Sequence, residues 1–169
     1  VVLPVLLASE GSATVTVTGR NLARRTVSLP VATAASYLKI DAAGLVDNGA
    51  NGSSGNGDNL PDAGETIALW PVLRETGGAA ATGITATVSC ADAGVTVVSG
   101  STTFANVGAN GTTAAASPVL INLAPTVVDA KTITLTFDTV SGGVHSFSEW
   151  PLTVRAPQLE VVSLNWDDT

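Results

Sequence analysis

The sequence is poor in the side chains that most often carry catalysis or bind transition metals. Its 169 residues include one histidine, one cysteine and no methionine. A single cysteine excludes an intrachain disulfide, and one histidine with one cysteine does not supply the ligands of a zinc site. The chain also has no G-x-S-x-G segment, the sharp turn that exposes a nucleophilic serine in many hydrolases. We therefore predict that the protein is not an enzyme.

The two reactive side chains that are present fit structural positions. Cys90 ends the segment ITATVSC, in which Ile84, Ala86 and Val88 alternate with polar residues. This alternation predicts a buried structural thiol at Cys90. His145 lies beside a Gly-Gly turn and is predicted to be exposed.

Charge is scarce and mostly negative. Charged residues make up 12% of the chain, and 14 acidic residues against 7 basic ones give a net charge of −7. A negative surface disfavours nucleic acid and anionic membranes as partners. The apolar run at residues 1–8 is too short to span a membrane. We expect a secreted or cell-surface protein, without membrane insertion.

Long helical periodicity is missing, and short alternating segments recur instead. Turn residues separate them every 8–12 positions, which is typical of an antiparallel β-sandwich of about seven strands. Pro71 interrupts the segment TIALWPVLR, so this strand is predicted to lie at a sheet edge or to carry a bulge. The fold class expected is therefore all-β. The alternating segments are 38–46, 66–74, 84–90, 95–98, 104–107, 119–123, 133–137 and 145–155.

The alternation also indicates the domain organisation. Residues 1–36 contain a hairpin, expected to be the C-terminal hairpin of a preceding domain with its linker, and residues 37–157 form the main sandwich. Residues 158–169 are expected to begin a following repeat, because LEV and WDD there resemble LKI and LVD of the main domain. Leu159 lies 121 residues after Leu38, a period that suits tandem sandwich domains.

The main polar segment is the glycine-rich acidic loop 47–65, DNGANGSSGNGDNLPDAGE. No basic residue lies between Lys39 and Arg74 to neutralise its four carboxylates. Carboxylate, amide and backbone oxygens are the ligands that Ca²⁺ prefers, so the composition predicts a structural calcium. A solvated, mobile acidic loop is the alternative interpretation. The candidate ligands are Asp47, Asn56, Asp58, Asp62 and Glu65.

The loop and the strands around it resemble a known family. The segments GNGDN, AGET, TGG and TGI resemble the pattern of the immunoglobulin-like modules that follow the catalytic domain of gingipain-like cysteine peptidases and occur in other large secreted bacterial proteins. Ala63 and Asn59 depart from the usual proline and glycine of that pattern. The resemblance implies an immunoglobulin-like β-sandwich. The resemblance does not imply peptidase activity, because no part of the chain resembles the catalytic domain.

These observations favour a non-catalytic structural or adhesion module in a tandem array, with calcium stiffening the loop near a domain junction. Its partners would be neighbouring domains of the same or identical chains, and a surface glycan or protein. One alternative is a carbohydrate-binding module that uses Trp70 and Trp150 as a stacking platform. The other is an accessory domain of a secreted gingipain-like peptidase.

Overall fold

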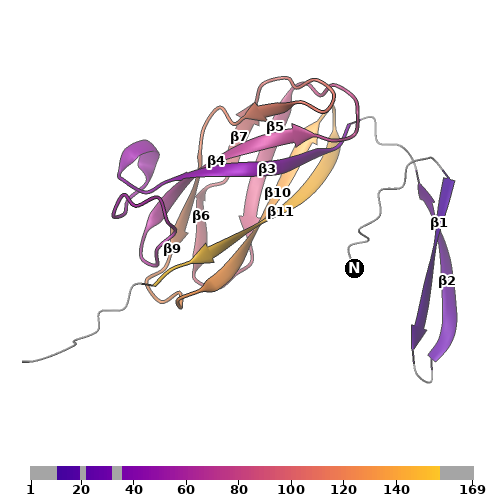
Figure 1. The fold of residues 1–169 in the computed structure, drawn as a ribbon, viewed down its shortest axis with the longest axis horizontal. Coiled ribbons are helices and arrows are strands. Elements are labelled where there is room, and N and C mark those ends of the chain that lie inside the picture. The colour runs from indigo at the N-terminus through magenta and orange to yellow at the C-terminus, as the bar shows by residue number, and fades with distance from the viewer. Residues whose placement is uncertain (1–10, 20–21, 32–35, 157–169) are drawn as a thin grey trace, which may run out of the picture. The chain divides into compact units, whose positions relative to one another are not determined.

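The computed structural model describes residues 11–19, 22–31 and 36–156 (Figure 1). The chain divides into two compact units, Val1–Ala35 and Ser36–Thr169. The predictions made for residues 1–10 and for the following repeat at 158–169 lie outside the described residues. In the part that is described, no helix is long and apolar enough to cross a membrane.

The first unit contains an antiparallel hairpin, as the alternation of threonine and valine predicts. Strand β1 (Gly11–Gly19) pairs with β2 (Leu22–Val31), and Val15 lies opposite Val27. Val27 is 55% exposed. The assignment of this hairpin to a preceding domain stays a prediction.

The second unit is built from two antiparallel sheets. One sheet has the order β11-β10-β5-β7, and the other has the order β3-β4-β9-β6 with β8 added beside β4. The two sheets contain four and five strands, more than the seven predicted in all. The strands are β3 (Leu38–Val46), β4 (Thr66–Glu75), β5 (Ile84–Cys90), β6 (Val95–Ser99), β7 (Ser101–Phe104), β8 (Thr112–Ala114), β9 (Val119–Leu123), β10 (Lys131–Ser141) and β11 (Val144–Val154).

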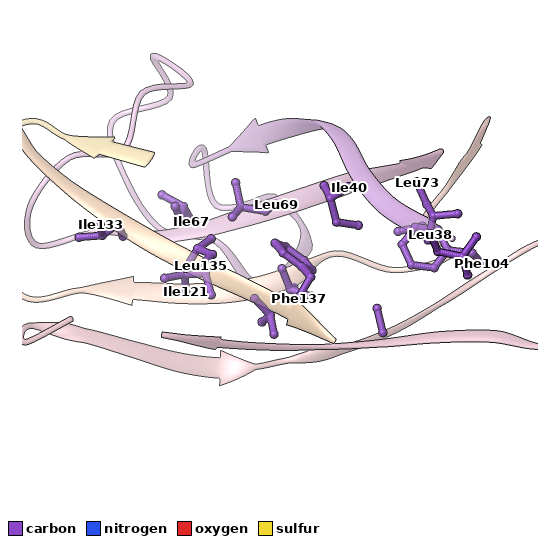
Figure 2. Close-up of a cluster of buried hydrophobic side chains, with 14 of the residues drawn as sticks. Leu38, Ile40, Ile67, Leu69, Leu73, Phe104, Ile121, Ile133, Leu135 and Phe137 are labelled. Carbon is purple, nitrogen blue, oxygen red and sulfur yellow. The ribbon is translucent and has the colours of Figure 1, made fainter. Parts of the chain in front are cut away.

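Alternating apolar side chains of both sheets meet in one core (Figure 2). On β10, Ile133, Leu135 and Phe137 are fully buried, while the residues between them are partly or fully exposed. Ile67 and Leu69 of β4 come from the other sheet and belong to the same cluster. The period-two pattern therefore predicts the all-β character and the inward faces correctly.

Serine side chains join the two sheets along one side of the unit. The Ser146 hydroxyl of β11 accepts the Leu38 amide at 3.3 Å, and the Ser148 hydroxyl accepts the Ile40 amide at 3.1 Å. Strands β3 and β11 are the outer strands of different sheets. These bonds satisfy β3 amides that would otherwise be unpaired at a sheet edge.

The position of Pro71 differs from the prediction. Strand β4 is central, because it pairs with β3 on one side and with β9 and β8 on the other. The edge-strand alternative is therefore wrong. The β3–β4 pair does carry a register shift, but it lies on β3, between Ile40 and Ala42. The proline is tolerated because β9 pairs only as far as Leu69 and β8 begins to pair at Val72. Its missing amide falls where β4 changes partner.

Strand β4 ends on a carboxylate that is entirely buried. Glu75 accepts backbone amides from Tyr37 at 3.1 Å, Gly78 at 3.0 Å and Asn110 at 2.9 Å, and from Gly77. Burial raises the pKa of Glu75, but these four N–H groups lower it more, so the pKa lies below the ordinary 4.5. One side chain thus holds the chain entry, the turn after β4 and the loop before β8.

We expect Glu75→Gln to lower the free energy of unfolding at neutral pH by about 1–3 kcal/mol, because an amide NH₂ would face backbone donors. The folded-state pKa is depressed, so the wild-type advantage is complete above pH 4.5 and is lost as the pH falls through the folded pKa. Urea unfolding between pH 7 and pH 3 measures this difference. Glu149→Gln, at an exposed position, is the control, and equal stabilities of all three proteins at pH 7 would contradict the prediction.

Candidate functional site

The acidic loop 47–65 is folded onto the end of the second sheet. Ser54 and Thr66 exchange backbone hydrogen bonds of 2.7 and 2.9 Å, and the Gly64 amide donates to the Leu123 carbonyl at 2.8 Å. The backbone turns sharply at Gly57 (φ 83°) and Asn59 (φ 60°), in the left-handed region that glycine and asparagine tolerate best. The loop is therefore an ordered part of the domain.

Three of the predicted ligands are buried carboxylates. Asp47 is 0% exposed, Asp62 is 4% exposed and Glu65 is 8% exposed. Carboxylates in an acidic loop would normally point into water, since burial of an ionised group is costly unless it is paired. Their burial argues against the alternative of a solvated, mobile loop.

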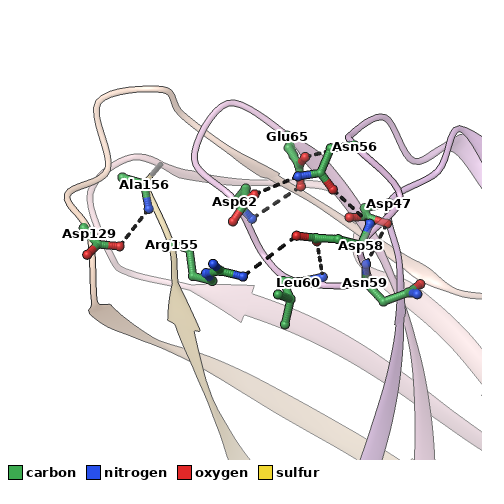
Figure 3. Close-up of polar contacts among 10 residues, drawn as sticks. All are labelled: Asp47, Asn56, Asp58, Asn59, Leu60, Asp62, Glu65, Asp129, Arg155 and Ala156. Carbon is green, nitrogen blue, oxygen red and sulfur yellow. Dashed lines mark hydrogen bonds and ion pairs between the residues drawn. The ribbon is translucent and has the colours of Figure 1, made fainter. Parts of the chain in front are cut away.

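Asn56 connects these carboxylates (Figure 3). Its backbone amide donates to Glu65 Oε1 at 2.9 Å, and its side-chain Nδ2 donates to Asp62 Oδ2 at 3.0 Å. Glu65 Oε2 also accepts the Asp62 amide at 3.3 Å, and Asp47 Oδ1 accepts the Asn59 amide at 3.2 Å. Three carboxylate oxygens therefore accept backbone amides of the loop, and a fourth accepts the Asn56 side-chain amide.

Two buried carboxylate oxygens have no such donor. Asp47 Oδ2 and Asp62 Oδ1 are inaccessible to solvent and have no hydrogen-bond partner. Leaving a charged oxygen buried without a partner costs the full desolvation penalty of that group. These two atoms are the buried carboxylate oxygens that the donors of the loop leave unsatisfied.

Asp58 is arranged differently from the other carboxylates. Its side chain is 40% exposed, its Oδ1 accepts the Leu60 amide at 2.9 Å, and its Oδ2 lies 3.8 Å from Arg155 Nη1. Figure 3 shows the Asp58 carboxylate directed toward Arg155. Asp58 remains connected to the buried group through its amide, which donates to Asn56 Oδ1 at 2.9 Å.

The structure therefore joins Asn56, Asp62 and Glu65 by hydrogen bonds within the loop, and Asp58 is connected to them through Asn56. Asp47 is held separately, by the Asn59 amide. Among the residues that the structure describes, no three His, Cys, Asp or Glu side chains gather closely enough to form a metal centre by themselves. A metal here would need amide or backbone oxygens as well, which Ca²⁺ accepts.

Gly55 is a functional position that the sequence reasoning did not identify. A Cβ at this residue would lie 2.6 Å from both Cδ and Oε1 of Glu65, and 2.7 Å from the Asp47 carbonyl oxygen. Glycine is required here because the backbone passes directly over these two oxygen-bearing groups. The run of five glycines in the loop is the only sequence signal for it, and it does not single out Gly55.

The other predicted sites are separate from the loop. Trp70, half-buried, is on β4 in the second sheet, whereas Trp150 is on β11 and packs against the core. Two tryptophans on different sheets, one of them facing inward, do not form the stacking platform of the carbohydrate-binding alternative. His145 is exposed, as predicted, and its Nδ1 lies 2.9 Å from Asp138 Oδ1.

Cys90 is only half-buried, and its side chain packs against the core. Burial raises the pKa of the Cys90 thiol above its usual value, while the backbone amide of Asp92 acts in the opposite direction. A raised thiol pKa lowers the fraction of reactive thiolate at neutral pH. Its position is therefore that of a structural cysteine, less deeply buried than the alternation predicts.

We expect Gly55→Ala to lower the free energy of unfolding by about 1–3 kcal/mol, because the added methyl group overlaps Glu65 and the Asp47 carbonyl. Gly108→Ala is the matched control, since a Cβ there meets no atom within 4 Å. Its stability should stay within about 0.5 kcal/mol of wild type. Denaturant unfolding of wild type, Gly55→Ala and Gly108→Ala measures these stabilities. A Gly55→Ala protein as stable as Gly108→Ala would contradict the expected overlap.

Comparison with known proteins does not identify a relative from which the function of the loop could be transferred. No protein-family model matches the chain. No curated protein matches it either. The function must therefore be inferred from the burial, contacts and charges of its residues.

Proposed function

We propose that this chain is a non-catalytic, immunoglobulin-like structural module in a tandem array of a secreted or cell-surface bacterial protein. A calcium ion bound in the loop 47–65 stiffens it. The two-sheet antiparallel architecture supports the sandwich part of this proposal. The immunoglobulin-like assignment, and the kinship with modules of gingipain-like peptidases, rest on the residue pattern of the loop and the following strands.

The observation that carries the metal proposal is the pair of unpartnered oxygens, Asp47 Oδ2 and Asp62 Oδ1. Glu75 provides the comparison within the same domain, because its buried carboxylate receives four backbone amides. The fold can thus satisfy a buried carboxylate with its own amides. A bound cation would account for the two oxygens that it leaves without donors.

The chemistry of the donors selects a hard cation. Carboxylate, amide and backbone carbonyl oxygens suit Ca²⁺, whereas zinc and copper favour nitrogen or sulfur ligands. Asp47 and Asp62 would hold the ion through their unpartnered oxygens. Glu65 and Asn56 are hydrogen-bonded to Asp62, and Asp58 is at the outer side of the loop. When bound, the ion would neutralise the buried negative charge and lock the loop against the sheet.

Calcium at one hundred times its dissociation constant should stabilise the folded protein by about 2.7 kcal/mol. We expect this to raise the melting temperature by several degrees over that of chelator-treated protein. Scanning calorimetry with and without CaCl₂ measures the shift, and isothermal titration calorimetry measures binding directly. Identical melting curves together with no binding heat would rule out the metal site.

Asp62→Asn should abolish the rise in melting temperature that calcium causes. The difference in melting temperature between variant and wild type should also depend on whether calcium is present. In calcium the variant should melt below wild type, because a ligand charge is lost. In chelator it should melt at the wild-type temperature or above it, because an uncompensated buried charge is removed. Asp138→Asn, which changes a carboxylate on β10, should retain the full calcium response. A calcium response preserved in Asp62→Asn would contradict the assignment of Asp62 as a ligand.

A further inference from the structure

The acidic loop is hydrogen-bonded to Arg155, the residue that directly follows β11. Residues 61–63 run parallel to the end of β11 in an isolated bridge between Asp62 and Arg155. The Arg155 amide donates to the Pro61 carbonyl at 2.8 Å, and the Ala63 amide donates to the Arg155 carbonyl at 2.7 Å. The residue on the loop side of this bridge is Asp62, whose Oδ1 is buried and unpartnered.

Side chains add to this connection. Arg155 Nη1 lies 3.8 Å from Asp58 Oδ2, and the Ala156 amide donates to Asp129 Oδ1 at 3.0 Å. Figure 3 shows Arg155 and Ala156 between the acidic loop and Asp129. Arg155 and Ala156 are the last two described residues of the chain and directly follow β11. Their position depends on contacts with two loops.

We propose that cation binding in the loop 47–65 clamps Arg155 and Ala156, so that calcium controls how firmly the residues that directly follow β11 are held to the loop. This inference rests on the proposed metal site and adds a function for it. The same residue, Asp62, contributes an unpartnered carboxylate oxygen to the loop and lies opposite Arg155 in the bridge.

The physical reason is electrostatic. Without a cation, Asp47 Oδ2 and Asp62 Oδ1 stay buried without a hydrogen-bond partner, and the lost solvation of these oxygens favours opening of the loop. Opening of residues 58–63 removes both backbone bonds to Arg155 together with the Asp58 ion pair. A cation that must dissociate before the loop opens suppresses this opening by a factor of about 1 + [Ca²⁺]/Kd.

Amide hydrogen exchange of the full chain, with CaCl₂ or with chelator, tests the clamp. The amides of Ala63 and Arg155 are the bridge donors, so their exchange reports its opening directly. At one hundred times the dissociation constant we expect their exchange to slow by about a hundredfold. The amides of Ala81 and Val107 form another isolated bridge and should slow far less.

Two variants sharpen the test. Asp62→Asn should remove the effect of calcium on the Ala63 and Arg155 amides. Asp129→Asn changes a carboxylate that contacts Ala156 but leaves its side-chain oxygen acceptor, and should keep the calcium effect. Calcium binding without slower exchange at Ala63 and Arg155 would overturn the clamp but not the metal site. Equal slowing at Ala81 and Val107 would also overturn it, and the absence of any binding heat would overturn both proposals.

Discussion

Strand β4 is held at its two ends by buried glutamates, and the loops around those ends depend on how these carboxylates are satisfied. Glu75, its last residue, receives four backbone amides and leaves no oxygen unpaired. Glu65 directly precedes the strand and receives the amides of Asn56 and Asp62. The loops around each end fold as they do because a buried carboxylate requires donors close by.

The two ends of β4 are also tied to the residues just before β3 and just after β11. Glu75 binds the amide of Tyr37, where the sandwich begins, and the loop that carries Glu65 is bridged to Arg155, where β11 has ended. Ten residues of extended strand separate the two points by about 33 Å. Both ends of this central strand are therefore anchored to residues distant in the chain, and the loop at the Glu65 end is the one with unpartnered carboxylate oxygens.

The alternation of apolar residues predicts the all-β class and the inward faces of strands such as β5 and β10 correctly, because the period of two follows directly from strand geometry. The partners of each strand were not predictable in the same way. Pro71 indicated an edge strand or a bulge, yet β4 is central, and it tolerates the proline because Pro71 lies where β9 gives way to β8. The prediction failed because strand order depends on contacts between segments distant in the chain.

The sequence alone determined the local chemistry of the protein: an all-β chain, a net charge of −7, and one loop rich in carboxylates and glycine. Only the tertiary structure decided which carboxylates are buried, and which of their oxygens find a donor. Glu75 looks like an ordinary strand-end glutamate until amides 38 residues before it and 35 residues after it converge on its oxygens. Asp47 and Asp62 are enclosed by the fold, whereas Asp58 is partly exposed and faces Arg155. Burial and hydrogen-bond satisfaction are properties of the folded neighbourhood, so residue type and spacing cannot specify them.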